Sequence, residues 1–499
     1  MNPFESLIAP IRHVLPELDP EDIVFNPPPN LDLGDVAVPF FSAARKLKQA
    51  PPKIAARVAE TAAFGAEVTE AKAAGPYLNL KLNRAAFTRR VVGAVLEAGA
   101  AFGSGGSGRG KRALIEHTSI NPNASPHVGR ARNAMVGDSV ARLLRFEAYD
   151  LAVHYYVNDM GRQIGLLVLI ADELQDLAFD QILDAYVRAN ARAEEDPEFA
   201  ARGYALLASM EEGDPETRRK FRAVTDLCLE GQLAVLARIG AQYDAFDHES
   251  DYLDDPRLRK VEAALRERGA LFTDEENRLV VDLAQLGYTL EEGRYFVLRR
   301  GNGSSMYGYR DLAYTIDKDT RGADADLIVL GEDHKLYAQQ IALVLEAAGF
   351  RAPEPIYYSY IVLKDGKMST RQGKVVLLAD FLDQAAALDA ERVAEQCKEL
   401  SEAEQRVIAE QVAVAAIRFA VLRVSPNKNV TFDMDAALSF TGDTGPYIQY
   451  SCARIHSILR RHGAPVPDTV AAAFPVETNA EWALLSRVAE FPGVVASAV

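Results

Sequence analysis

The sequence predicts an α/β protein with an open parallel sheet, preceded by an α+β domain and followed by an all-α domain. An apolar strand, a helix of 3.6-residue periodicity and a second apolar strand follow one another between residues 112 and 159, which is the pattern of a β-α-β unit. Before this unit helical and alternating segments mix, and after residue 376 the periodicity is helical. The Gly- and Ser-rich segment 103–110 separates the first two parts.

The first predicted domain covers residues 1–105. A helix is expected to end near Gln49 and another to begin at Pro51, because proline is tolerated in the first turn of a helix. The segment GPYLNLKLN, residues 75–83, alternates apolar and polar side chains and predicts a strand. These segments indicate a small α+β domain.

The second predicted domain covers residues 106–375 and carries the parallel sheet, and the third, residues 376–499, is helical. A charge-rich helical segment at about 165–265 is expected to be an insertion into the second domain. Strands of the sheet are expected in these apolar runs: 112–120, 150–159, 278–287, 295–300, 326–331 and 355–363.

The composition is that of a large globular protein, with 499 residues of which 48% are hydrophobic and 25% charged. The cysteines, Cys228, Cys397 and Cys452, lie far apart, which argues for a reducing compartment and against a zinc site. No signal peptide and no run of about 18 apolar residues is apparent, so we expect a cytoplasmic protein with no membrane partner. The net charge of −16 leaves a nucleic-acid partner open, because a local basic surface can bind phosphate.

The segment SINPNASPHVGRARNAM, residues 119–135, joins the first strand of the β-α-β unit to its helix. Such a loop lies at the carboxyl edge of the sheet, where free N–H groups and the helix dipole favour an anion. His127 could donate to a phosphate, and Gly129 would let a base or ribose lie against the backbone. The alternative is a turn with an incidental histidine and glycine.

The segment LKDGKMSTRQGKVV, residues 363–376, is a second candidate for phosphate binding. Lys367 and Arg371 lie beside Ser369 in an otherwise acidic chain, and such a loop suits the neutralisation of charge on a departing pyrophosphate. The alternative is a solvated basic loop.

Together these segments resemble the HxGH and KMSK signatures of class I aminoacyl-tRNA synthetases. Further motifs are similar, in order and over nearly the whole chain, to those of arginyl-tRNA synthetases: EHTSINPNASPHVG, YYVNDMGRQI, YGYRDLAY, GEDHKLYAQQ, KMSTRQG and FTGDTGPYIQYSCARIHSI. The resemblance implies a class I synthetase Rossmann-like catalytic domain, an N-terminal tRNA-binding domain and a helical anticodon-binding domain that stops earlier than in the family.

The resemblance also implies the reaction. ATP, accompanied by Mg²⁺, would activate L-arginine to arginyl-adenylate, and the arginyl group would pass to the 2′-hydroxyl of the terminal adenosine of arginine tRNA. The family generally needs bound tRNA for the first step. We expect a monomer without a resident metal ion.

The resemblance assigns site residues as follows. The catalytic positions are His127, Gly129, Arg130, Lys367, Ser369 and Arg371. The ATP contacts are His127, Gly129, Gly331, Asp333, His334 and Met368. The arginine contacts are Glu116, Asn121, Tyr307, Asp311 and Gln340. The tRNA contacts are Asp443, Tyr447, Tyr450 and Arg454.

The physical chemistry of these residues fits their implied roles, although each has an alternative. A guanidinium prefers carboxylate partners, which Glu116 and Asp311 would supply. A structural ion pair with Arg310 or another cation is the alternative for both. Tyr447 and Tyr450 could stack on bases. The alternative is a partly buried helix in which Tyr450 and Arg454 lie at i, i+4 spacing.

Two signature positions differ from the family. Arg130 replaces the second histidine of HxGH and either reaches phosphate or points to solvent. In KMSTR, Arg371 is expected to supply the second cation in place of Thr370. An RNA-binding relative without catalytic activity and a small-molecule nucleotidyltransferase therefore remain as alternative functions.

Overall fold

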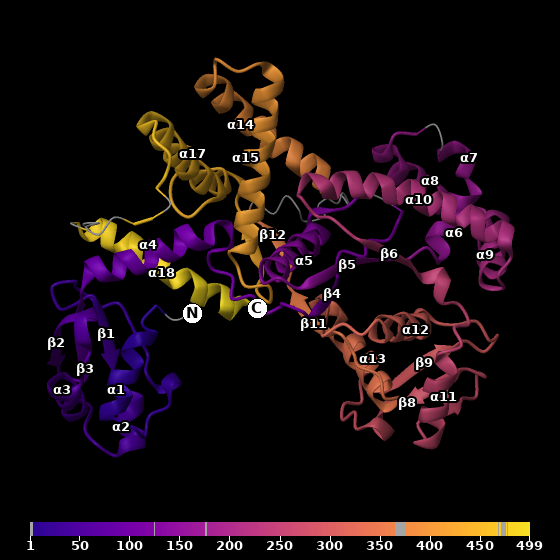
Figure 1. The fold of residues 1–499 in the computed structure, drawn as a ribbon. Coiled ribbons are helices and arrows are strands. Elements are labelled where there is room, and N and C mark those ends of the chain that lie inside the picture. Colours follow the sequence, from indigo (N-terminus) through magenta and orange to yellow (C-terminus); the bar gives the residue numbers. More distant parts are fainter. Residues whose placement is uncertain are drawn as a thin grey trace. The chain divides into compact units, whose positions relative to one another are not determined.

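The computed structural model describes residues 3–123, 125–174, 177–364, 376–467, 469–470, 476 and 478–499. The chain forms two compact units (Figure 1). The first unit contains Met1–Ser107, Phe146–Ala148 and Gly463–Val499, and the second contains Gly108–Arg145 and Tyr149–His462. No helix in the described part of the chain is long and apolar enough to cross a membrane.

The first unit contains a three-stranded antiparallel sheet of order β1-β3-β2. Its strands are β1 Val36–Pro39, β2 Val68–Ala74 and β3 Tyr77–Leu82. Its helices are α1 Ile8–Val14, α2 Phe41–Leu47, α3 Pro51–Thr61, α4 Arg84–Ala98 and α18 Asn479–Ala498. The predicted helix start at Pro51 and the predicted strand in 75–83 are confirmed.

Helix α18 completes the core of this unit. Trp482 on α18 is 2% exposed, and the centroid of its ring lies 5.2 Å from that of Phe87 on α4. The guanidinium of Arg84 lies 4.8 Å from the centroid of the Trp482 ring. In the sequence this helix falls within the third predicted domain, 376–499. Helical periodicity reveals an apolar face but does not say what the face packs against, and here that partner is α4.

The second unit is built on a parallel five-stranded sheet of order β11-β10-β4-β5-β6. Its strands are β4 Arg112–Glu116, β5 Asp150–Val157, β6 Ala245–His248, β10 Ala325–Gly331 and β11 Glu354–Tyr358. The crossover helices next to it are α5 Val128–Phe146, α12 Tyr307–Thr320 and α13 Lys335–Ala347. The predicted β-α-β unit is confirmed as β4-α5-β5.

Two predicted strands of the parallel sheet lie elsewhere, so that expectation was wrong. An antiparallel sheet of order β7-β8-β9 consists of Leu271–Thr273, Leu279–Asp282 and Tyr295–Arg299. One side of it packs with α11, Leu258–Glu267, in a separate apolar cluster. A short apolar run identifies a strand but not the sheet it joins.

Helices fill most of the predicted insertion, but one strand of the parallel sheet also lies within it. The helices are α6 Arg162–Leu169, α7 Ala171–Leu174, α8 Phe179–Glu195, α9 Pro197–Glu211 and α10 Pro215–Arg238. They share an apolar core of their own. Strand β6 lies within the expected 165–265 range but pairs with β5 in the parallel sheet, which the charge-rich sequence around it did not reveal.

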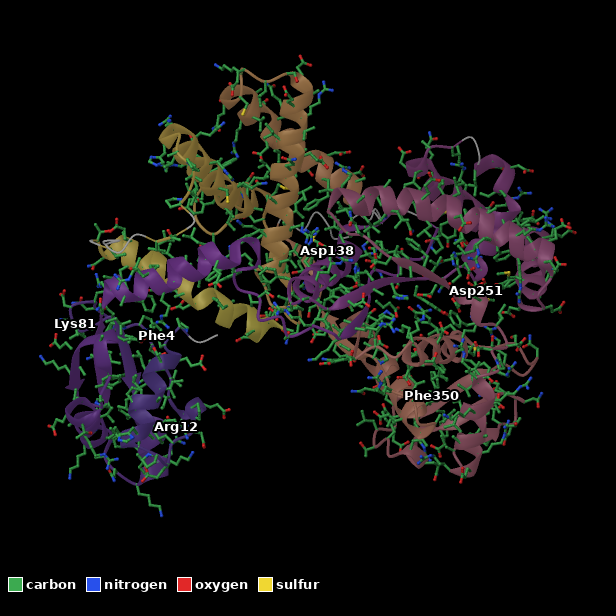
Figure 2. The ribbon with its side chains drawn as sticks, in the orientation of Figure 1. Phe4, Arg12, Lys81, Asp138, Asp251 and Phe350 are labelled. Atoms are coloured by element: carbon green, nitrogen blue, oxygen red, sulfur yellow. The ribbon has the colours of Figure 1, made fainter. Side chains whose placement is uncertain are left out.

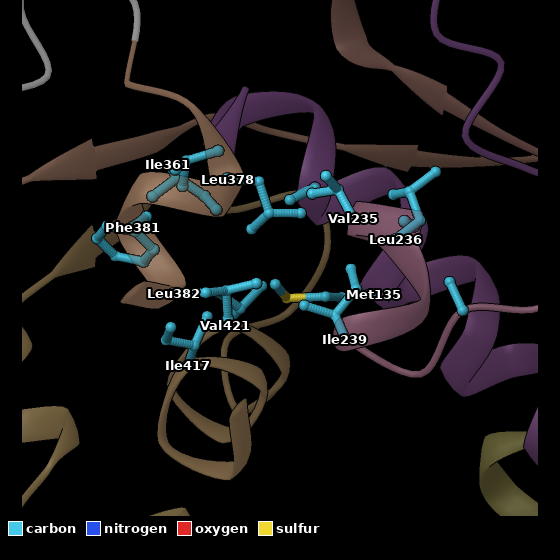
Figure 3. Close-up of a cluster of buried hydrophobic side chains, with 14 of the residues drawn as sticks. Met135, Val235, Leu236, Ile239, Ile361, Leu378, Phe381, Leu382, Ile417 and Val421 are labelled. Atoms are coloured by element: carbon cyan, nitrogen blue, oxygen red, sulfur yellow. The ribbon is translucent and has the colours of Figure 1, made fainter. Parts of the chain in front are cut away.

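Of the remaining helices of this unit, the first three share an apolar core with α5 and β5, and the fourth packs against the second of them. They are α14 Leu378–Gln396, α15 Glu402–Leu422, α16 Met434–Ala437 and α17 Gly445–His462, with β12 Ile361–Leu363 paired to β13 Val430–Phe432. Figure 3 shows the shared core, in which Met135 of α5 lies beside Ile239, and Leu382 and Ile417 belong to the same cluster. Asp138 of α5, labelled in Figure 2, accepts a 2.6 Å hydrogen bond from Arg418 of α15. Helices α5 and α15 are therefore held together by both apolar and ionic contacts.

The short 3₁₀ segments lie between these elements. They are η1 Glu5–Leu7, η2 Pro20–Asp22, η3 Gly65–Glu67, η4 Gly99–Ala101, η5 Glu249–Tyr252, η6 Leu283–Leu286 and η7 Glu332–His334. Segments η5 and η7 directly follow strands of the parallel sheet and bring their side chains to its carboxyl edge.

Candidate active site

A cavity of about 400 Å³ opens at the carboxyl edge of the parallel sheet. We call it the central cavity. Strand β4 is at the centre of the sheet, with β5 as its neighbour on one side and β10 on the other. The strand order reverses between β4 and β10, so the cavity lies at a topological switch point. Open α/β sheets bind ligands at such points.

Many of the predicted site residues line the central cavity. They are Glu116, Asn121, Arg130, Tyr307, Asp311, Gly331 and His334. The structure does not place His127, Gly129, Asp333 or Gln340 on its wall. Lys367, Met368, Ser369 and Arg371 lie outside the described residues.

The loop after β4 has a strained backbone. Thr118 and Ser119 adopt positive φ angles of 78° and 45°, which are uncommon for residues with a Cβ. The Thr118 N–H donates to Asn133 Oδ1 over 2.7 Å, and Asn133 Nδ2 donates to the carbonyl of Val329 over 2.9 Å. The Thr118 hydroxyl is hydrogen-bonded to Tyr243 Oη at 2.6 Å. These contacts hold the turn that aims the following residues at the cavity.

His127 immediately precedes α5. Its Nδ1 accepts a hydrogen bond of 3.3 Å from the Arg130 N–H, which leaves Nε2 to carry the proton of a neutral ring. Burial and the nearby Arg130 charge lower the pKa of His127, so the ring is a neutral donor near pH 7. A Cβ at Gly129 would come within 3.0 Å of this Nδ1, so glycine lets the ring fold over the helix start.

Backbone hydrogen bonds join the HxG loop to residues 376–378. The Val128 N–H donates to the carbonyl of Val376 over 3.1 Å, and the Leu378 N–H donates to the carbonyl of Pro126 over 2.8 Å. These bonds lie on either side of the histidine. Val376 and Leu378 are therefore held beside the start of α5.

The carboxylates of the site differ in their partners. Lys318 Nζ donates to Glu116 Oε2 over 2.6 Å, and both side chains are buried. Arg310, which the sequence analysis considered as a partner for Glu116 or Asp311, instead binds Glu249 at 2.6 Å. Glu116 therefore faces the cavity with its charge already balanced, as the ion-pair alternative expected, but by a different cation.

Asp311 is in a different state. Its Oδ2 accepts a 2.6 Å hydrogen bond from Tyr337 Oη, and it has no ion pair with a Lys, Arg or His among the described residues. Burial raises the pKa of Asp311 to about 6. The hydroxyl of Tyr156, also on the cavity wall, is buried and has no hydrogen-bond partner in the described part of the chain. This part of the cavity is suited to a cationic hydrogen-bond donor.

The other predicted residues are placed as follows. The Asn121 Nδ2 lies 3.4 Å from Gln163 Oε1 at the mouth of the loop. Gln340 is turned away, because its Nε2 donates to the carbonyl of Gly293 over 2.6 Å. Asp333 and His334 lie in η7, with 3.7 Å between His334 Nε2 and Asp333 Oδ2.

The predicted tRNA contacts lie at and before α17. Only Gly445 and Pro446 of this helix are buried. Tyr447 and Tyr450 are 45% and 47% exposed, and the guanidinium of Arg454 lies 5.8 Å from the Tyr450 ring. The contact of Tyr450 with Arg454 is the i, i+4 pair of the alternative, and the exposed rings are also open to a partner. Asp443 precedes the helix, and its carbonyl accepts a 2.9 Å hydrogen bond from Arg423.

Lys318, Tyr156 and Tyr337 were not selected from the sequence. The two tyrosines lie in the segments YYVNDMGRQI and GEDHKLYAQQ, but nothing in those segments distinguishes a cavity tyrosine from a packed one. Lys318 lies seven residues after Asp311, which places both on one face of α12, and this spacing was the only available signal.

The comparisons with known proteins agree with this geometry. Residues 92–434 match the family model for the catalytic domain of class I tRNA synthetases (R), residues 5–82 match the arginyl tRNA synthetase N-terminal domain, and residues 448–499 match the DALR anticodon-binding domain. The chain is 36% identical over 469 residues to an arginine–tRNA ligase of Methanoregula boonei, covering 92% of this chain and 82% of that protein. A similar relative from Methanospirillum hungatei is 36% identical, with 94% and 83% covered.

A solved structure is also similar. The arginyl-tRNA synthetase of Thermus thermophilus aligns with a TM-score of 0.78 and 28% identity, covering 99% of this chain and 87% of that one. The fold, the cavity and the catalytic-domain match define a class I aminoacyl-tRNA synthetase. Within that class, the chain belongs to the arginyl-tRNA synthetase family.

Proposed function

We propose that this chain is an arginine–tRNA ligase that carries out both half-reactions in the central cavity. In the first, a carboxylate oxygen of L-arginine attacks the α-phosphorus of ATP, and pyrophosphate leaves. In the second, the 2′-hydroxyl of the terminal adenosine attacks the carbonyl carbon of arginyl-adenylate, and AMP leaves. The cavity supports this reaction by positioning and by charge stabilisation, without a side-chain nucleophile.

The observation that carries the proposal is the state of Asp311. Of the carboxylates discussed above, Glu116 and Glu249 already have internal cations, whereas Asp311 faces the cavity with a tyrosine hydroxyl as its donor. A buried carboxylate without a cation is costly, and a guanidinium from the substrate would relieve that cost. Tyr307, which is 53% exposed on the cavity wall, would cover the bound side chain.

The phosphates would lie at the start of α5. The neutral His127 can donate through Nε2, and Arg130 on the cavity wall can supply a fixed positive charge. Lys367, Ser369 and Arg371, which lie outside the described residues, are proposed to close over the triphosphate. Gly331 and His334 would face the adenosine, with Asp333 and Met368 contributing to the same pocket.

Mg²⁺ would arrive with ATP. In our proposal the ion is coordinated mainly by phosphate oxygens and water, which is its usual preference. Its chemistry would be to neutralise charge on the triphosphate as pyrophosphate leaves.

Transfer RNA would contact the exposed face of α17. Tyr447 and Tyr450 offer rings for stacking, and Arg454 offers a guanidinium for phosphate. Their exposure supports this role. Asn121 and Gln340 are proposed to hold the α-amino end of arginine, although Gln340 would have to release the carbonyl of Gly293 to do so.

The function is tested by ATP–pyrophosphate exchange with arginine, with and without cognate arginine tRNA. We expect exchange that requires arginine and increases strongly when the tRNA is added. Arginine-dependent exchange also excludes the nucleotidyltransferase alternative. A folded protein that binds arginine tRNA but exchanges no pyrophosphate under either condition would instead be the RNA-binding relative without catalytic activity.

Arg130→Ala is expected to slow adenylate formation. Loss of a cation that stabilises charge on the leaving phosphates typically raises a barrier by about 1–4 kcal/mol. Single-turnover kinetics with saturating arginine and tRNA would measure the change. Arg145→Ala is the matched control, because Arg145 is on the same helix but pairs with Asp244 outside the cavity. Equal rates for the two variants would contradict the phosphate role.

A further inference from the structure

Tyr337 is the hydroxyl donor to Asp311, the cavity carboxylate that forms no ion pair with the described residues. It lies on the first turn of α13, and its Oη is 2.6 Å from Asp311 Oδ2 on α12. The Tyr337 ring packs against two other rings, with centroids 5.0 Å from Tyr307 and 6.1 Å from Phe296. Because these contacts fix the direction of the ring, they also fix the direction of the hydroxyl.

The hydroxyl remains a donor at every pH at which the enzyme would work. Burial, and then the neighbouring Asp311, raise the pKa of Tyr337 well above its ordinary value. A neutral tyrosine can donate to a carboxylate without cancelling its charge. Tyr337 therefore differs from Lys318, which neutralises Glu116 nearby.

We infer that Tyr337 is a positioning residue that fixes the Asp311 carboxylate in the orientation in which it receives the substrate guanidinium. The inference rests on the proposed function and deepens it. With Oδ2 held by Tyr337, rotation of the carboxylate is restricted, and its remaining lone pairs keep one direction in the cavity. A planar guanidinium depends on that direction more than a point charge does, because its N–H groups have a fixed geometry.

Several charged and titratable groups face Asp311, and each affects its protonation. Burial raises the pKa of Asp311, the Tyr337 hydrogen bond lowers it, Glu116 on β4 raises it and Lys318 on α12 lowers it. Tyr307 of α12, Tyr156 of β5, and Glu249 with Arg310 complete the surroundings. Without the Tyr337 hydroxyl, a contribution that lowers the pKa is lost and the carboxyl protonates at higher pH.

The test is Tyr337→Phe in the full chain, with arginine tRNA present. We expect the KM for arginine to rise about 10-fold while kcat and the KM for ATP change little, since a hydrogen bond to a charged group is lost only at the arginine subsite. Arginine binding needs the ionised carboxylate, so the acid limb of kcat/KM for arginine should move upward by about one pH unit.

Tyr309→Phe is the matched control. Tyr309 also donates to a carboxylate, that of Glu262, but it does not line the central cavity. Both variants lose one tyrosine–carboxylate hydrogen bond. A difference between them in the KM for arginine therefore measures the effect of losing that bond inside the central cavity. Thermal unfolding of both variants, and direct titration of arginine into Tyr337→Phe, separate a binding defect from a folding defect.

The outcomes are distinct. An unchanged arginine KM and an unchanged acid limb in Tyr337→Phe would overturn the inference while the parent enzyme remains active. A loss of kcat in Tyr337→Phe with an unchanged arginine KM would also overturn it, because the residue would then act on chemistry or folding. An inactive parent enzyme would overturn the proposed function itself, and the inference with it.

Discussion

Asp311→Asn is expected to reduce kcat/KM for arginine by about 10³-fold, the scale of removing one partner of a buried charge pair. Asparagine keeps the shape of the side chain and can still accept from Tyr337, so the change isolates the negative charge. Steady-state aminoacylation at several arginine concentrations measures the effect. The same pairing predicts that citrulline, which lacks the positive charge, is rejected by about 10⁴-fold.

Asp311→Asn should not lower the stability of the folded protein, although it lowers the activity. Burial raises the pKa of Asp311 to about 6, above the value of 3.8 taken for the unfolded chain. At pH 7 the ionised form therefore costs folding free energy, and a neutral asparagine removes that cost. We expect the thermal midpoint of Asp311→Asn at pH 7 to equal or exceed that of the parent.

Asp317→Asn is the control for this experiment. Asp317 is on the same helix but pairs with Arg257 and Arg321 and does not line the cavity. Its replacement should lower stability and leave the arginine KM unchanged. Efficient citrulline activation, or equal arginine kinetics in the two variants, would contradict the assignment of Asp311.

Arg132→Ala is expected to destabilise the second unit by about 3–5 kcal/mol, the range for breaking a buried charged network. Arg132 is 0% exposed on α5. Its guanidinium donates to backbone carbonyls of two separate segments, at 2.5 Å to Ser359, 2.8 Å to Lys428 and 3.1 Å to Ser425. Removal takes this donor from all three carbonyls, of which that of Ser425 still accepts from the Lys428 N–H, and leaves a cavity beside the segments that precede β12 and β13.

Urea unfolding of the parent, of Arg132→Ala and of Arg142→Ala would measure this difference. Arg142 is on the same helix, but its side chain is 60% exposed, and its buried partner Asp138 would keep the hydrogen bond from Arg418, so Arg142 should contribute about 1 kcal/mol or less. Arg132→Lys should lie between the two, because an ammonium cannot reach all three carbonyls at once. A loss in Arg132→Ala no greater than in Arg142→Ala would show that the network is not structural.

The order of elements around the site was readable because local sequence specifies it. The helix predicted between the strands 112–120 and 150–159 is α5 at 128–146, and the HxG loop lies at its start. The strand predicted at 112–120 ends instead at Glu116, because Thr118 and Ser119 adopt positive φ angles. That turn depends on hydrogen bonds to Asn133 and Tyr243. These partners are distant in the chain, so no local sequence pattern predicts them.

The sequence does not distinguish the two predicted substrate carboxylates from each other. Both Glu116 and Asp311 were selected because a guanidinium needs carboxylates, and both line the central cavity. Only the structure distinguishes them, since Glu116 is paired with Lys318, 202 residues away in the chain, and Asp311 is not. The roles of both residues in binding arginine remain predictions.

The sequence by itself determined the types and the order of the elements, the signature segments and, through them, the family. These depend on periodicity, turn-forming residues and spacing, which are properties of neighbouring residues in the chain. The tertiary structure alone decided that β8 and β9 leave the parallel sheet, that α18 packs with α4, and that Tyr337 reaches Asp311. Each of these is a choice of partner, and partners are selected by packing in space, where residues distant in the chain compete for the same apolar face or charge.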